Sequence, residues 1–203
     1  MRRLAALGAV LLVTACGATD GHDAGHPHAA ASSAGSAASA APSAGPFNGT
    51  DVQFATDMIP HHRQAVDMAA LAATKAADPG VKAIAAKIRA AQEPEIATMA
   101  GWLTAWGEPV PSPGAMHHDM GDMGGMPGML TDTELRQLGA ASGAAFDKLF
   151  LTLMIKHHEG PVETATTVQA QGSSPAVKQL AGAVVTGQTA EITEMKALLA
   201  KLP

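Results

Sequence analysis

Two long stretches of the chain carry the spacing of amphipathic helices. Apolar residues recur at i, i+3 and i+4 over residues 48–106 and again over residues 143–202, in an alanine-rich background that favours helix. Each stretch contains in its middle an N-cap residue followed by proline, the pair that opens a new helix: Asp78-Pro79 and Ser174-Pro175. Each stretch therefore predicts a hairpin of two helices, the first helix ending just before that pair.

Prolines also fall inside the first helix of each predicted hairpin. Pro60 lies in the first stretch, and Gly160-Pro161 lies in the second. Because proline removes a helical N–H and crowds the preceding turn, we expect a kink or a restarted helix at each. Between the stretches, Thr131-x2-Glu134 has the form of a capping box and predicts a short additional helix.

The two stretches are copies of one unit. When residue n is placed against residue n+96, they align without gaps over about fifty residues. Phe-x3-Met-Ile-x-His-His occurs at 54–62 and 150–158, and Gln-x2-Glu-Ile-x2-Met occurs at 92–99 and 188–195. A duplicated helical hairpin predicts an all-α fold, a four-helix bundle.

Polar residues of the repeat fall on the faces expected to be buried. At 100° per residue, His61 and His62 lie about −60° and +40° from Met58 and so flank the apolar stripe of their helix. Glu95 is the one charge in the stripe of the second helix, which we expect to run through Ala91. A buried carboxylate is costly without a partner, and the imidazole pair of the facing helix offers one.

Two readings of this pattern remain open. In the first, the Glu and His side chains form a dry polar network that only specifies the core. In the second, imidazoles and thioethers form metal sites, whose expected ligands are Met58, His61, His62, Met99, Met154, His157, His158 and Met195. Four further side chains would then be ligands or would orient the ligating imidazoles: Glu95, Glu191, Gln92 and Gln188.

Composition adds weight to the metal reading. The 203 residues include nine His and eleven Met, but one Cys and no Tyr. A single Cys excludes a disulfide framework and a Cys-rich zinc or iron–sulfur site within one chain. The formal charge of −5 becomes −7 without Arg2 and Arg3, and an acidic chain lacking basic clusters gives no support for nucleic-acid binding.

The region between the units, residues 107–142, combines a methionine-rich loop with the predicted short helix. Glycine and proline argue against a stable helix in the loop, and a solvent-exposed loop has no packing reason to be rich in Met. Thioethers suit Cu(I) and Ag(I), and imidazoles suit Cu(I) and Cu(II). We therefore expect copper, as Cu(I) or Cu(II), or silver as the metal, and we expect the loop to capture it through Met116, His117, His118, Met120, Met123, Met126 and Met129. The alternative is a low-complexity linker with incidental Met.

The N-terminus reads as an export signal. Residues 1–16 combine two arginines, an apolar stretch of ten residues and Val13-Thr14-Ala15-Cys16, which resembles a lipobox that leaves Cys16 as the lipid anchor. An ordinary signal peptide with an incidental Cys is the alternative. Residues 17–46 are dominated by Ala, Ser, Gly and Pro and predict a disordered spacer before a domain at 47–203. We therefore expect an exported, membrane-anchored lipoprotein on the extracytoplasmic side.

The paired His-His and Gln-x2-Glu-Ile-x2-Met motifs resemble those of the bacterial family catalogued as domain of unknown function 305, over about residues 48–202. The resemblance implies a ferritin-like four-helix bundle and, because some members are periplasmic copper-binding proteins, a metal-binding role for the Met and His of both His-His motifs. The second unit departs from the family pattern. Pro161 stands at the place of Ala65, and Thr164 at the place of Met68.

From these observations we expect a non-enzymatic protein that binds copper, or silver, and buffers it or hands it to a copper-transfer partner. A ferritin-like metalloenzyme of the oxidase type is the first alternative, although such sites usually use Glu-x2-His, which the chain lacks. The second alternative is a surface scaffold with a metal-free His/Glu core.

Overall fold

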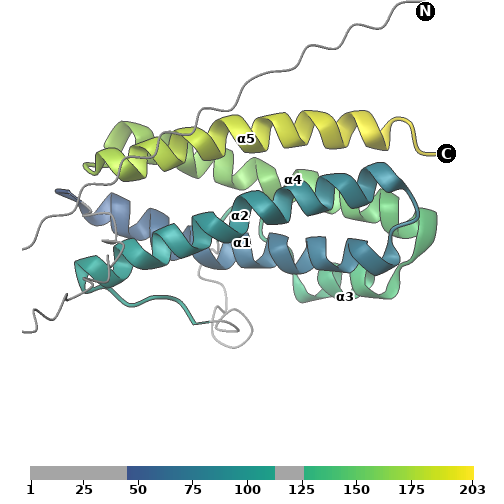
Figure 1. Ribbon diagram of the computed structural model, residues 1–203, viewed down its shortest axis with the longest axis horizontal. Helices are drawn as coiled ribbons and strands as arrows, with labels where there is room; N and C mark the ends of the chain where they lie inside the picture. Colours follow the sequence, from purple (N-terminus) through teal and green to yellow (C-terminus); the bar gives the residue numbers. More distant parts are fainter. Residues whose placement is uncertain (1–44, 113–125) are drawn as a thin grey trace, which may run out of the picture. The chain divides into compact units, whose positions relative to one another are not determined.

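A computed structural model describes residues 45–112 and 126–203, and the elements within these ranges are helices (Figure 1). They are α1 (Gly49–Lys75), α2 (Pro79–Trp106), α3 (Asp132–Ala140), α4 (Gly143–Gln171) and α5 (Pro175–Leu199). The helices α1 and α2 form one hairpin and α4 and α5 form the other, while the short α3 packs against α1 and α4. The predicted all-α bundle of two duplicated hairpins is confirmed.

The local signals that open the helices act as expected. Asp78 caps α2 by accepting hydrogen bonds from the N–H groups of Gly80 (2.7 Å) and Val81 (3.1 Å), and proline follows the cap. Ser174 caps α5 in the same way. The capping box of Thr131 and Glu134 opens α3. These short-range hydrogen bonds satisfy N–H groups that a helix leaves free in its first turn.

The internal prolines do not end their helices. Helix α1 continues through Pro60 and α4 continues through Pro161, so neither helix restarts at its proline, and the kink that was the other expectation stays a prediction. Both helices are long, with 27 and 29 residues, and packing on neighbouring helices holds them together. Proline still removes one donor. In α4 the carbonyl that loses its helical partner is that of His157, four residues before Pro161.

The apolar core has two parts. The first, which we call the Phe54 cluster, lies between the first half of α1 and the second half of α4; its members include Phe54, Met58, Met99, Trp102, Val168 and Val184. The second, the Phe150 cluster, joins the second half of α1 to the first half of α4; its members include Met68, Ile84, Ile88, Phe150, Met154 and Met195. The repeated His-His pairs lie along α1 and α4 between these two groups.

Buried aspartates tie each unit to the turn of the other. Asp147 of α4 accepts hydrogen bonds from the N–H groups of Ala77 (3.1 Å) and Asp78 (2.9 Å) in the α1–α2 turn. Asp51 of α1, its equivalent 96 residues earlier, accepts from Ser173 (2.9 Å) and Ser174 (3.1 Å) in the α4–α5 turn. The two hairpins are therefore joined by reciprocal polar contacts at both ends.

Several predicted features lie outside the described residues. These are the signal peptide, Cys16 and most of the spacer, together with Met116, His117, His118, Met120 and Met123 of the loop. Within residues 45–112 and 126–203, none of the helices combines the length and apolarity that crossing a bilayer would require.

Candidate metal centre

Four histidines meet in the interior of the bundle, and we call them the histidine layer: His61, His62, His157 and His158. The rings of His61 and His157 are in contact in a tilted arrangement, with centroids 3.7 Å apart and planes inclined by 42°. These two residues are equivalent in the repeat. A contact between residue n and residue n+96 must lie on the pseudo-two-fold axis that relates the units, so both units contribute to one central layer.

The outer histidines of the layer contact the repeated glutamates. His62 Nε2 lies 2.7 Å from Glu95 Oε2, and His158 Nε2 lies 3.1 Å from Glu191 Oε2. An ionised carboxylate can only accept, so Nε2 is the donor in each pair. A neutral imidazole that donates from Nε2 keeps its lone pair on Nδ1. The expected contact between Glu and His is therefore present, and it orients both Nδ1 atoms.

The buried nitrogen atoms of the layer are mostly unpartnered. Both ring nitrogens of His157 and Nδ1 of His62 and His158 lack a hydrogen-bond partner among the described residues, and the ring of His61 has no side-chain partner there, only the main chain of Pro127 and of His157 close to it. The side-chain amides of Gln92 and Gln188 are also buried without partners. An unpaired buried polar group costs about 1–3 kcal/mol, so a cluster of them calls for a further ligand. Metal coordination is one chemistry that would satisfy imidazole lone pairs.

Burial keeps the central pair neutral. Desolvation by burial lowers the pKa of His61 and of His157 well below the ordinary value of 6.5, and the charges of neighbouring imidazoles act in the same direction. The main chain of Pro127 and of His157 opposes this by raising the pKa of His61. Neutral imidazole is the form that binds metal ions, so the environment favours the ligating state at neutral pH.

Methionines flank the layer on both sides. Met58 precedes His62 by one turn of α1, and Met99 follows Glu95 by one turn of α2, so the antiparallel hairpin places both in the Phe54 cluster. Met154 and Met195 are their counterparts in the Phe150 cluster. The structure thus gathers the predicted Met and His residues around one level of the bundle, with one Met pair on each side.

Two expectations about exposure are wrong. Ala91 is exposed, and the buried stripe of α2 passes through Gln92 instead, because the helix turns its amide inward between Ile88 and Met99. Met126 is buried rather than solvent-exposed, since it packs into the Phe54 cluster, and Met129 is half-buried against the same cluster. No local sequence signal indicates that these two loop residues rest on the bundle.

Ligand chemistry limits what the centre can hold. In the described part of the chain, no three His, Cys, Asp or Glu side chains converge as a metal-binding group. A metal at the histidine layer would therefore need thioether or amide donors in addition to imidazole. Thioethers are soft donors that select Cu(I) and similar ions over hard cations such as Mg²⁺.

Comparison with known proteins agrees with the fold. The model of the family "Domain of unknown function (DUF305)" matches residues 51–199. A DUF305 protein of Streptomyces coelicolor has a similar structure, with a TM-score of 0.67 and 35% identity over 75% of this chain and 93% of that one. A DUF305 fragment from Deinococcus radiodurans has a TM-score of 0.67 and 30% identity over 77% and 99% of the two chains.

A third similar structure is that of CopM. Its Cu(II)-bound form gives a TM-score of 0.63 and 34% identity, covering 74% of this chain and 95% of that chain. CopM structures in Cu(I)-bound and Ag-bound forms are similar as well. Among curated proteins, none matches the chain. The match of the family model over most of the bundle, and the identity to these structures, show that the chain belongs to the DUF305 family.

Proposed function

We propose that the protein binds copper as Cu(I), with Ag(I) as a second cargo, through imidazoles of the histidine layer and the flanking thioethers. The observation that carries this proposal is the set of buried imidazole nitrogens on His61, His62, His157 and His158 that have no side-chain partner and lie between two methionine pairs. A neutral imidazole and a thioether together are the donor set that a soft monovalent ion prefers. CopM, a similar structure, is known in Cu(I)-, Cu(II)- and Ag-bound forms, which supports the same cargo here.

Glu95 and Glu191 support such a centre without being ligands themselves. Each accepts a hydrogen bond from Nε2 of a histidine, and this fixes the orientation of the ring and leaves Nδ1 as the nitrogen available to a metal. Outer groups of this kind fix the tautomer and orientation of ligating imidazoles. A metal-free polar network would use the same two contacts, but it would leave both ring nitrogens of the buried His157 without a hydrogen bond.

The protein acts in this proposal as an exported lipoprotein that buffers copper or passes it to another protein. Cys16 would carry the lipid, and the methionines of the loop would deliver metal to the bundle. The similar Streptomyces coelicolor structure is described as a protein predicted to be secreted, which supports export. Incorporation of labelled palmitate, lost in Cys16→Ser, tests the anchor; export without labelling would contradict it.

A chelator competition tests the metal centre. The chain from residue 17 onward is titrated with Cu(I) against a chromogenic chelator, and His61→Gln/His157→Gln is compared with the matched pair His117→Gln/His118→Gln in the loop. We expect the first pair to remove the tightest binding and the second to leave it. Unchanged affinity in the first pair would refute the centre, provided that circular dichroism shows both variants folded.

Metal content separates this proposal from the alternatives. Elemental analysis of protein purified from copper-fed cells should find copper in stoichiometric amount. Stoichiometric iron or manganese, together with oxidase turnover, would favour the ferritin-like enzyme instead. A protein without metal, whose thermal stability is indifferent to added Cu(I), would favour the scaffold, because a ligand that binds only the folded state must stabilise it.

A further inference from the structure

A short piece of the region between the units rests on the histidine layer. We call residues 126–130 the docked segment. The main chain of Pro127 acts on the imidazole of His61, and the Pro127 carbonyl lies so close to Gly160 that a Cβ on that residue would overlap it. Gly128 has a φ of +91° and lies against the carbonyl of His157. The docked segment therefore touches both central histidines or their immediate neighbours.

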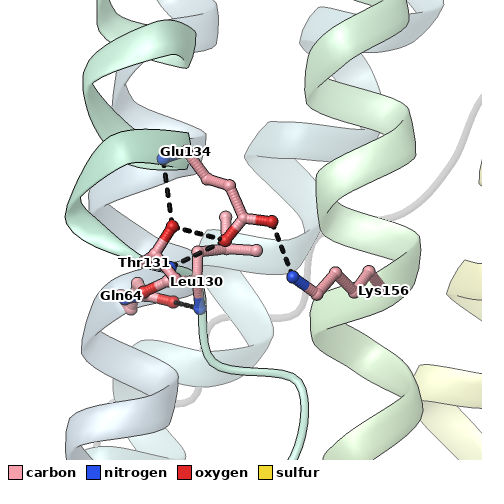
Figure 2. A network of polar contacts seen from close by, with 5 residues as sticks. All are labelled: Gln64, Leu130, Thr131, Glu134 and Lys156. Atoms are coloured by element: carbon pink, nitrogen blue, oxygen red, sulfur yellow. Dashed lines mark hydrogen bonds and ion pairs between the residues drawn. The ribbon is translucent and has the colours of Figure 1, made fainter.

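Helices of both units hold the docked segment in place (Figure 2). From α1, Gln64 Nε2 donates to the carbonyl of Leu130 (3.2 Å), and the Leu130 N–H donates back to Gln64 Oε1 (2.8 Å). From α4, Lys156 Nζ donates to Glu134 Oε1 (2.6 Å), and the same glutamate closes the capping box that follows the segment. Gln64 lies one turn after His61, and Lys156 adjoins His157, so both anchors flank the central pair.

Because the docked segment is anchored in this way, the side chain of Met126 is buried. Its side chain is 9% exposed and belongs to the Phe54 cluster, together with Met58 and Met99. The Phe150 cluster on the other side of the layer also contains three methionines, since Met68 joins Met154 and Met195. The repeat has no methionine equivalent to Met68 in the second unit, where Thr164 stands.

We propose that Met126 is a thioether ligand of the metal centre, supplied by the docked segment in place of the methionine that the second unit lacks. The inference rests on the proposed copper binding. It gives each of the two apolar clusters beside the layer three buried methionines, and thioethers together with imidazole favour Cu(I) and Ag(I) over Cu(II) or Zn²⁺. The simpler role of Met126 would be to fill a gap in the core, which methionine does readily.

A conservative pair of variants separates the two roles. Met126→Leu keeps the apolar volume and removes the sulfur, and Leu103→Ile makes a conservative change at another buried position of the same cluster without touching a sulfur. We expect Met126→Leu to weaken Cu(I) binding at one site by about 10- to 100-fold, the range seen when a metal site loses a supporting group. X-ray absorption of the Ag(I) form should count one sulfur fewer. Leu103→Ile should change neither the Cu(I) affinity nor the sulfur count.

The same measurements distinguish a failure of the Met126 proposal from a failure of copper binding by the whole centre. If wild-type protein binds Cu(I) with loss in His61→Gln/His157→Gln, but Met126→Leu has the same affinity and sulfur count as wild type, Met126 is core filler and the proposal is overturned. If wild-type protein binds no Cu(I) in the bundle, the proposed function itself fails.

A second variant moves the docked segment without touching a sulfur. Gly160→Ala places a methyl group on the Pro127 carbonyl and should displace the segment, whereas Gly187→Ala in α5 meets open space. We expect Gly160→Ala to expose Met126 to oxidation by peroxide, read by mass spectrometry, and to lose the same 10- to 100-fold in Cu(I) affinity. Exposure of Met126 with affinity unchanged would overturn the proposal.

Discussion

Metal-free protein should lose stability as the pH falls from 7.5 to 5.0, because His61 and His157 are neutral when folded and free to protonate when unfolded. Burial lowers both pKa values well below 6.5. Between the lowered folded pKa and 6.5, the unfolded chain binds more protons than the folded protein, so the free energy of unfolding rises with pH in this window. This stability is complete above pH 6.5 and is lost as the pH falls toward the folded pKa values.

The size of the loss follows from the same linkage. A histidine that stays fully neutral in the folded state down to pH 5.0 costs at most RT ln(1 + 10^1.5) there, or about 2 kcal/mol, so about 4 kcal/mol is the upper limit for the two together. A domain typically has a free energy of unfolding of about 5–15 kcal/mol. The two central histidines alone would therefore remove a large share of the stability.

Urea denaturation of chelator-treated protein at pH 7.5, 6.5, 5.5 and 5.0 measures this loss. His157→Gln should recover part of it and His61→Gln/His157→Gln most of it, because each variant removes a histidine whose protonation the folded state resists. The reasoning is refuted if wild type and the double variant lose equal stability over this range, or if the His61 and His157 ring resonances of the folded protein titrate near pH 6.5.

Substitutions at four other kinds of position should change the free energy of unfolding, or the affinity for Cu(I), by very different amounts. Asp147→Ala removes the acceptor for two N–H groups of the α1–α2 turn and should cost about 2–4 kcal/mol, with Asp51→Ala comparable, as read by urea denaturation. Phe150→Ala opens a cavity in a fully buried position and should cost about 3–5 kcal/mol in the same assay. Lys87→Ala breaks only an exposed ion pair and should cost less than about 1 kcal/mol; a cost equal to that of Asp147→Ala would contradict the ranking. Glu191→Gln should weaken Cu(I) binding about 10- to 100-fold in the chelator competition while leaving the fold intact, and unchanged binding would argue against its orienting role.

The helices could be predicted because their signals are local. A cap such as Asp78 followed by proline acts within one turn, and the repeat offers each signal twice. The effect of Pro60 and Pro161 could not be predicted in the same way, since a proline costs a helix one hydrogen bond whereas packing over the whole length of the helix decides whether it continues. The burial of Gln92, where burial of Ala91 was expected, has a similar origin. Neighbouring positions on a helix differ by 100°, and an apolar pattern favours the alanine even where the bundle buries the amide.

The members of the candidate centre could be predicted more fully than their arrangement. Helical spacing places His61 and His62 beside the core, but which helices adjoin is a long-range property, and the contact between His61 and His157 crosses from one unit to the other. Met126 could not be placed at all. Its position depends on hydrogen bonds between Gln64 and Leu130, 66 residues apart in the chain, and no local pattern reports such a pairing.

The anchoring of the docked segment has a consequence for how a duplicated protein can differ from a pair of identical subunits. Gln64 and Gly160 are equivalent positions of the two units, and both meet the same segment. Gln64 forms hydrogen bonds with the main chain of the docked segment, and Gly160 leaves space for the segment because it has no side chain. A homodimer must carry the same residue at both places, and so could offer either two hydrogen-bonding side chains or two positions without a side chain. Because the two copies are fused into one chain, the single docked segment can cross the symmetric histidine layer, and each unit can carry a different amino acid where it contacts the segment.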